Sequence, residues 1–317
     1  MNFLSLSTET EYDRYADTYN AFMPPPPQTG AEIKSRDARK IRPRGRFLIE
    51  KDGKDVGVAG FSQSEFCAEQ DRCLIWAYVR PEYLGQGIAT FAQEKLFDQV
   101  TALGMNILEA GCRETNQAGL EFLESQGFAE TMREWESILN VANFDPALFA
   151  GAREHVETAG LRLTTLAEEI SRLGQREAYL RLHSLDEEVG PDVPSDAPEI
   201  TPPFEEWEKT LLSGPNFRPD SFFLAVAPDD SYAGISMLFH KQATKDLTTG
   251  LTGVRRAWRR HGVALALKLM AIDYAKSLGA PQIYTENATT NVGMLSINQK
   301  LGFVRQPAEI LFKRTLA

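Results

Sequence analysis

Hydrophobic and polar residues alternate in much of the stretch from 46 to 80. The pattern then changes to a helical period. Three short stretches rich in apolar residues, the first two separated by the turn pair Asp52-Gly53, are typical of strands joined by hairpins. Apolar residues then recur every three or four positions from 88 to 100, which predicts an amphipathic helix. Strands are therefore predicted at 46–51, 56–64 and 73–80.

The same stretch continues with a further strand and a further helix. Leu103-Gly104 ends the first helix, residues 106–111 have the composition of a strand, and Asn116 caps a helix that runs to Gln126. Two helices, at 10–20 and 33–40, precede the strands. The first half is thus predicted to be a mixed α+β unit.

The second half of the chain shows the same order of elements. Strands are predicted at 221–227, 232–240, 247–255 and 282–286. Helices are predicted at 165–182, 203–213, 262–277 and 291–301.

The two halves also match residue by residue at an offset of 175. From 71 to 128, 13 of 58 positions are identical to the residue 175 places later, whereas unrelated sequences agree at about one position in sixteen. The identities fall on turn and cap residues such as Gly87 and Gly262, or Asn116 and Asn291. The chain is therefore predicted to contain one unit twice.

We expect an N-terminal unit at 1–143, a connector at 144–160 with a helix from Pro146, and a C-terminal unit at 161–317. The second copy has extra residues, which we place in a Pro- and Asp-rich loop at 186–203. The expected fold is two tandem α+β domains, each a mixed, mostly antiparallel sheet flanked by helices.

Composition and charge disfavour several classes of protein. The formal net charge of −10 disfavours a generic nucleic-acid binder, and the longest apolar helix is too short and too charged to cross a membrane. Three cysteines without paired spacing and four scattered histidines predict neither a disulfide framework nor a metal site. The MNFLSL start has no secretory pattern, so we expect a cytoplasmic protein.

A strand ending in valine, a glycine turn and a helix form an anion-binding device in each half. The segments are Val79–Ala89 in the first copy and Val254–Ala264 in the second. Backbone N–H groups of such a turn point at the ligand, and the helix dipole adds to the attraction. The spacing fits neither a P-loop nor a Rossmann fingerprint.

With these residues, the chain resembles the GNAT superfamily of acyl-CoA-dependent N-acetyltransferases. The family pattern [Arg/Gln]-x-x-Gly-x-[Gly/Ala] is met by Arg259-x-x-Gly262-x-Ala264, and both halves end a later helix in Gly-Phe. The resemblance covers most of both halves and implies acetyl-CoA as co-substrate, with direct transfer to a primary amine of a small molecule.

The resemblance also implies where the cofactor binds. The predicted positions in the C-terminal unit are Val254, Arg255, Arg259, Arg260, His261, Gly262, Val263, Ala264, Asn287 and Asn291. The predicted positions in the N-terminal unit are Val79, Gly85, Gln86, Gly87, Ile88, Ala89 and Asn116.

The acceptor amine must lose a proton, and a carboxylate near the splayed strand is the expected base. Asp246 and Glu286 are the two candidates. The family often has a tyrosine four residues before Gly-Phe as acid for the departing thiolate, but Asn298 stands there in the second unit. Asn298 is thus the candidate for stabilising the thiolate or holding a water.

The first unit departs further, with Leu84 in place of the arginine and Leu123 in place of the tyrosine. We therefore expect the C-terminal unit to be catalytic and the N-terminal unit to be degenerate. Two alternatives remain open: a non-catalytic CoA-binding or regulatory protein, and an acyltransferase resembling mycothiol synthase. The protein is expected to be a monomer or a homodimer.

Charge differs between the copies. Seven basic residues lie within 34–46, whereas nine acidic residues and no basic residue lie within 186–208. An acidic rim at the acceptor site would concentrate a cationic amine. The alternative is that both stretches are solvated faces or attract each other.

Overall fold

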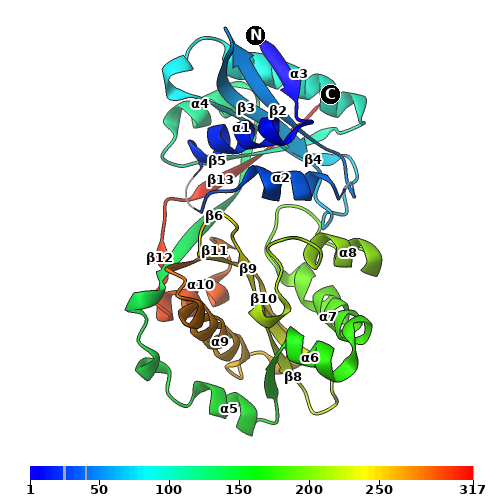
Figure 1. Ribbon diagram of the computed structural model, residues 1–317, viewed down its shortest axis with the longest axis vertical. Coiled ribbons are helices and arrows are strands. Elements are labelled where there is room, and N and C mark those ends of the chain that lie inside the picture. Colours follow the sequence, from blue (N-terminus) through cyan, green and yellow to red (C-terminus); the bar gives the residue numbers. More distant parts are fainter. Residues whose placement is uncertain (24–25, 40, 317) are drawn as a thin grey trace. The chain divides into compact units, whose positions relative to one another are not determined.

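The computed structural model describes residues 1–23, 26–39 and 41–316, and it separates into two compact units (Figure 1). Unit 1 contains residues up to Arg133 together with 242–244 and the strand that begins at Glu309. Unit 2 contains Glu134–Lys241 and Lys245–Ala308. Each unit is an α+β fold in which helices pack on a largely antiparallel sheet, as the sequence predicts.

In unit 1 the strands are ordered β1-β2-β3-β4-β5-β13, and only β4 and β5 are parallel. Its elements are β1 (Asn2–Ser5), α1 (Glu9–Asn20), α2 (Gly30–Asp37), β2 (Arg44–Lys51), β3 (Lys54–Ser62), β4 (Arg72–Val79), α3 (Ile88–Ala102), β5 (Ile107–Arg113), α4 (Gln117–Ser125), the first part of β6 (Ala129–Asn140), and β13 (Glu309–Thr315).

In unit 2 the order is β7-β8-β9-β10-β11-β6, and only β10 and β11 are parallel. Its elements are the rest of β6, α5 (Ala152–Thr158), β7 (Arg162–Thr165), α6 (Leu166–Leu173), α7 (Gln175–Val189), α8 (Phe204–Leu211), β8 (Phe222–Val226), β9 (Tyr232–His240), β10 (Leu247–Val254), α9 (Val263–Leu278), β11 (Gln282–Ala288), α10 (Val292–Lys300) and β12 (Val304–Arg305).

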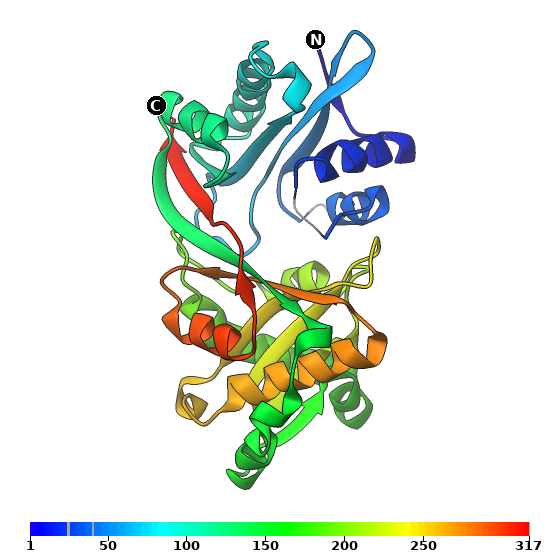
Figure 2. The same cartoon turned by 90° about the vertical axis from the view of Figure 1, so that its left-hand side faces the viewer.

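The two units exchange a strand. The last strand, β13, pairs antiparallel with β5 of unit 1, from Glu309 opposite Arg113 to Thr315 opposite Ile107. The second part of β6 pairs with β11 of unit 2 (Figure 2). The compact units therefore differ from the expected sequence units in three places: 134–143 cluster with unit 2, whereas 242–244 and the residues from 309 cluster with unit 1.

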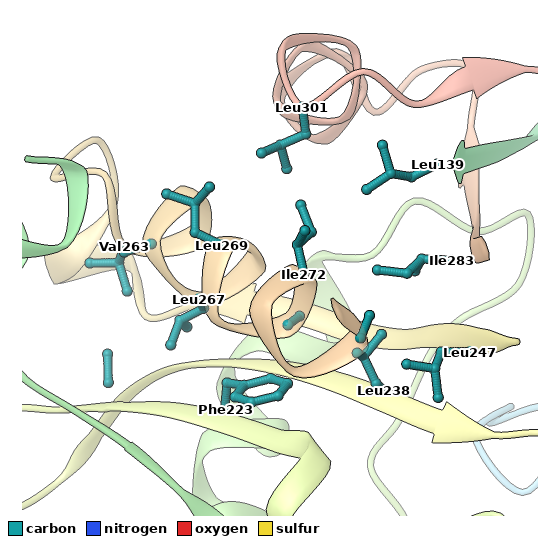
Figure 3. Close-up of a cluster of buried hydrophobic side chains, with 14 of the residues drawn as sticks. Leu139, Phe223, Leu238, Leu247, Val263, Leu267, Leu269, Ile272, Ile283 and Leu301 are labelled. Atoms are coloured by element: carbon teal, nitrogen blue, oxygen red, sulfur yellow. The ribbon is translucent and has the colours of Figure 1, made fainter. Parts of the chain in front are cut away.

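The core of unit 2 surrounds helix α9, whose apolar side chains meet the inner face of the sheet. Figure 3 shows Leu267 and Ile272 of α9 with Phe223, Leu238 and Ile283 from three strands. All of these side chains are buried, and each contributes about 1.5–3 kcal/mol through removal of apolar surface from water. This packing fixes the position of the glycine turn that precedes α9.

Several predicted elements differ in extent. The helix predicted at 165–182 breaks at Gly174, which has φ of 83°, and the second segment continues to Val189, into the predicted loop. The connector helix begins at Ala152, and Pro146 starts only a 3-10 turn. Strands β1, β6, β7, β12 and β13 were not predicted from the sequence.

Candidate active site

The sheet of each unit opens between its two parallel strands. In unit 1 the pairing of β4 with β5 ends at Leu74 and Glu109, while β4 continues to Val79. In unit 2 the pairing of β10 with β11 ends at Thr248 and Tyr284. Beyond these pairs the strand edges do not bond to each other, so a ligand that carries amide groups can pair with them.

A turn of the same backbone conformation follows β4 and β10. Gly85 and Gly87 have φ of 71° and 74°, and Arg260 and Gly262 have φ of 65° and 77°. Gly87 and Gly262 are the N-cap residues of α3 and α9, whose first N–H groups have no partner within the helix. Both turns therefore have the form of an anion-binding site.

The arginine side chains beside the second turn contact protein groups. Arg259 donates from Nε to the Val254 carbonyl oxygen at 2.9 Å and forms an ion pair with Asp192. Asp192 also accepts from Arg256 at 2.6 Å, and hydrogen bonds from Arg256 and Arg259 lower the pKa of its carboxyl to about 2. Asp192 thus neutralises charge at the predicted phosphate site.

The Arg255 side chain links the end of β10 to β9 and α7. Its Nε donates to the Tyr232 carbonyl oxygen at 2.7 Å, and its guanidinium reaches Glu188 and Ser184 of α7. Arg80 of unit 1 makes the corresponding contacts, with the Asp55 carbonyl oxygen at 2.8 Å and with Thr18 of α1 at 3.3 Å. The Arg255 guanidinium is therefore used within the protein, although we predicted it as a cofactor contact.

Several other predicted cofactor residues direct their side chains toward the protein itself. Ile88 and Val263 point into the cores of their units. Ala264 packs at the edge of the unit 2 core, and the His261 Nδ1 atom lies 2.9 Å from the Arg259 carbonyl oxygen. In unit 1, Gln86 accepts a hydrogen bond from Lys51 at 2.6 Å.

Unit 1 has a cleft of about 430 Å³ at the opening between β4 and β5. Its walls combine strand, turn and helix residues of the motif, and Leu84 stands 58% exposed at its turn. The lining includes Trp76, Tyr78, Val79, Leu84, Ala89, Gln93, Cys112, Asn116, Phe122, Leu123 and Phe128. The predicted residues Val79, Ala89 and Asn116 thus meet at one cavity.

Asn116 and Asn291 have matching roles at the starts of α4 and α10. The side-chain oxygen of Asn116 accepts from the Gly119 N–H at 3.1 Å, and that of Asn291 accepts from the Met294 N–H at 3.2 Å. These caps satisfy orphan donors of each helix. Within the described part of the chain, the side-chain amide nitrogen of neither asparagine donates a hydrogen bond.

Asn298 is almost fully buried on α10 and faces β11. Its Nδ2 donates to Asn287 Oδ1 at 2.7 Å, so two predicted site residues meet. Its own Oδ1 has no hydrogen-bond partner among residues 1–23, 26–39 and 41–316. A buried acceptor without a donor is costly, which favours a ligand or water at this position.

Asp246 and Glu286 lie at different places along the strands. Asp246 is buried just before β10, and its charge helps to raise the pKa of Tyr284 to about 12, after the larger effect of burial. Glu286 is exposed on β11, two residues beyond the last pair with β10, at the opening of the sheet. The register of β11 places Glu286 opposite Glu136 of β6.

Glu134 is a site residue that the sequence analysis missed. Burial raises the pKa of its carboxyl to about 7, and the charges of Glu286 and Asp196 add to this effect. Glu134 lies on the same face of β6 as Glu136, because side chains two residues apart share a face. It was missed because β6 was not predicted, and no motif marks it.

Part of the acidic stretch at 186–208 is paired inside unit 2. Asp186 accepts from Trp207 Nε1 at 2.9 Å, whereas Glu188 and Asp192 bind the arginines beside the turn. In the basic stretch, Arg46 and Arg44 form ion pairs with Asp37 and Glu65, and Lys40 lies outside the described residues. Local pairing therefore neutralises part of each charged stretch.

Two kinds of feature are absent from the described part of the chain. No cluster of three or more histidine, cysteine or acidic side chains there has the arrangement of a metal site. No described helix is both long and apolar enough to span a bilayer.

Comparison with known proteins agrees with this geometry. The profile described as "Acetyltransferase (GNAT) family" matches residues 13–128 and again 179–303. Aminoglycoside N(6')-acetyltransferase type 1 from Klebsiella aerogenes is 27% identical over 112 residues, which is 33% of this chain and 74% of that protein.

Two solved structures share the fold over 99% of this chain. One is a tandem GNAT protein from the clavulanic acid biosynthesis pathway, with a TM-score of 0.75, 15% identity and 98% of that chain covered. The other is a GCN5-related N-acetyltransferase from Sphaerobacter thermophilus, with a TM-score of 0.71, 18% identity and 95% covered. The two profile matches together span more than half of the sequence, one in each half. The chain is an acyltransferase that belongs to the acetyltransferase (GNAT) family and carries two of its units in tandem.

Proposed function

We propose that this protein transfers an acetyl group from acetyl-CoA to a primary amine of a small molecule, and that the C-terminal unit performs the reaction. The observation that carries the proposal is the arrangement along β10. Its end leads into the turn at Arg260–Gly262, and carboxylates stand where β10 and β11 separate. An anion site thus lies at the end of the open strand β10, and candidate proton acceptors lie on the neighbouring strands β11 and β6.

The residues of unit 2 fit a coenzyme A thioester. Acetyl-CoA supplies the activated acyl group and a pyrophosphate, for which the N–H groups at the start of α9 are suited. The free edge of β10 between Thr248 and Val254 offers backbone groups to the amides of pantetheine. Asn287, Asn291 and Asn298 supply polar groups on the side of β11 and α10.

Glu134 is proposed as the base that receives the proton of the acceptor amine, with Glu286 beside it. A general base works best when its pKa is near the working pH, and Glu134 meets this condition because of burial and its acidic neighbours. Asp246 is the weaker candidate, because it precedes β10, on the paired side of the opening.

The acceptor class is proposed from charge and from the named relative. Glu134, Glu286 and Asp196 place negative charge together, which favours a cationic amine. The relative from Klebsiella aerogenes acts, by its name, on an aminoglycoside, which is an aminated sugar. We therefore propose an aminated sugar or another polyamine as acceptor.

A second function is favoured for unit 1 by its cleft. The cavity has room for a ligand, but Leu84 and Leu123 stand in it where polar groups would be needed for catalysis. We propose that unit 1 binds a CoA-type ligand without transferring its acyl group. We also propose a cytoplasmic location, since Cys67, Cys73 and Cys112 are all free thiols.

The test is release of free CoA thiol from acetyl-CoA with a panel of amines: an aminoglycoside, glucosamine, spermidine and a peptide with a free N-terminus. Gly262→Glu places a charge in the turn of unit 2, and Gly87→Glu is its matched control in unit 1. We expect turnover to be lost in Gly262→Glu and kept in Gly87→Glu. The reverse result would assign catalysis to unit 1, and binding of acetyl-CoA without turnover on any amine would favour a non-catalytic protein.

A further inference from the structure

Lys268 of α9 is a buried cation that the reaction described above does not use. Its side chain is 3% exposed, and its Nζ lies 5.4 Å from the centre of the Phe303 ring. Among the residues that the structure describes, it has no hydrogen bond and no carboxylate partner. Burial lowers the pKa of Lys268 to about 8. An unpaired buried ammonium is costly, so its presence calls for a function.

The internal repeat relates Lys268 to a residue on the cleft wall of unit 1. Its counterpart 175 residues earlier is Gln93, which lines the cleft of unit 1 and donates to Gln126 at 2.7 Å. In unit 2 the counterpart of Gln126 is Leu301, which offers no polar side chain. Lys268 therefore has no equivalent, at that position, of the polar side chain that holds Gln93 in unit 1.

The neighbouring positions of that wall also correspond. Leu123 and Phe128, which line the cleft of unit 1, correspond to Asn298 and Phe303 of unit 2. Phe303 contacts Lys268 through its ring and donates from its backbone N–H to the Asn298 carbonyl oxygen at 3.0 Å. Lys268 thus belongs to the same side of unit 2 as Asn298, whose Oδ1 also lacks a partner there.

We propose that Lys268 is the acid that protonates the sulfur of the departing coenzyme A in the C-terminal unit. This inference rests on the proposed acetyl transfer and names a residue for the proton that Asn298 cannot supply. The new bond joins the acceptor nitrogen to the acyl carbon, and the bond from that carbon to sulfur breaks. Its electron pair stays on sulfur and takes the proton from Lys268 Nζ. The amine proton goes to the carboxylate base, and solvent reprotonates the lysine.

The chemistry fits a lysine in this environment. An ordinary lysine is a poor acid for a thiolate, whose conjugate thiol has a pKa of about 8.5. An ammonium with little water around it gives up its proton more readily and also attracts the negative sulfur strongly. Before the ligand binds, the face of the Phe303 ring partly compensates for the absence of an anion beside the Lys268 ammonium.

The kinetic test compares Lys268→Met with Lys276→Met. Lys276 is on the same helix and also lies over a phenylalanine ring, that of Phe144, at 4.9 Å, but it is exposed, and its counterpart Thr101 is not among the residues that line the cleft of unit 1. We expect Lys268→Met to lower kcat by about 100-fold with little change in KM for acetyl-CoA, and Lys276→Met to have wild-type kcat. In the wild type, kcat should also fall above pH 8, and this fall should be absent from Lys268→Met. A folded Lys268→Met protein with wild-type kcat and pH profile would overturn the proposal.

A binding test separates this inference from the proposed function. Calorimetry at pH 8 compares coenzyme A with desulfo-coenzyme A, which lacks the thiol. We expect the unit 2 site of a Gly87→Glu background to prefer coenzyme A about 5-fold, and Lys268→Met to remove the preference. If each protein bound coenzyme A and desulfo-coenzyme A equally well, the proposed role of Lys268 would be overturned, and the proposed function would stand. Failure of the unsubstituted site to bind either compound would overturn the proposed function itself.

Discussion

Arg260 and Gly85, which stand 175 residues apart, adopt the same left-handed backbone conformation, with φ of 65° and 71°. The turn of unit 2 thus has, at an arginine, the conformation that a glycine adopts in unit 1. A non-glycine residue in this conformation costs about 1–2 kcal/mol, a strain that is often found at functional sites. We infer that the Arg260 side chain has a use that compensates for the strain, and we propose a phosphate group as its partner.

Replacement of Arg260 by glycine should relieve the strain. We expect Arg260→Gly to raise the free energy of unfolding by about 1 kcal/mol and to weaken coenzyme A binding, measured by denaturant titration and calorimetry. Arg260→Ala is the control, because it removes the same charge and retains the positive φ. A glycine variant no more stable than the alanine variant would contradict the prediction.

Removal of the Asp192 carboxylate should free the arginines beside the turn. Asp192 holds both Arg256 and Arg259, so it competes with a phosphate for them. We expect Asp192→Asn to tighten coenzyme A binding by about 5-fold at low salt and by less at high salt, because the groups are exposed. Asp230→Asn, which removes a carboxylate paired with Arg172 and Arg181 of the same unit, should leave the affinity unchanged.

The rate of transfer should follow the titration of Glu134. Its pKa is raised to about 7, so the carboxyl is protonated below that pH and cannot accept the amine proton. We expect kcat to rise as the pH increases through 7, and Glu134→Gln to lower kcat by about 100-fold and remove this rise. Glu130→Gln, on the same strand but in unit 1, serves as the control. An unchanged pH profile in Glu134→Gln would assign the titration to another group.

The buried charge of Lys268 should also make stability depend on pH. The folded state has a pKa of about 8 for this group, lower than the ordinary 10.5, so the unfolded chain binds more protons between these values. The contribution of Lys268 should therefore rise by about 3 kcal/mol between pH 8 and 10.5, at about 1.4 kcal/mol per pKa unit. Lys268→Met should lack this rise and be more stable below pH 8, as measured by urea unfolding, whereas Lys276→Met should keep it.

The exchanged strands should couple each unit to residues from the other sequence copy. Phe312 of β13 is buried in the core of unit 1, and Leu139 of β6 is buried in that of unit 2. We expect Phe312→Ala to cost about 3–5 kcal/mol and to speed hydrogen exchange in β5, with little change in β11. Leu139→Ala should have the reciprocal effect. Equal changes in both strands would show that the units unfold together.

The sequence alone predicted the parts that depend on local pattern. The repeat offset, the glycine turns, the asparagine caps and most strands and helices follow from residue type and spacing, because short-range conformational rules govern them. Resemblance in these same residues pointed to the family. The break of the helix at Gly174 was not predicted. A single glycine within a helical period of apolar residues did not indicate that the helix ends there.

The tertiary structure decided which distant residues meet. Strand pairing is non-local, so the exchange of β6 and β13 has no signal in the spacing of the chain, and it is this exchange that brings Glu134 beside Glu286. Likewise, Lys268 interrupts an apolar helix in the sequence, but only packing shows that its ammonium is buried without an anion. The sequence by itself determined that there are two similar units with a turn for an anion. Burial and register, which depend on the whole fold, decided which carboxyl and ammonium groups have pKa values suited to catalysis.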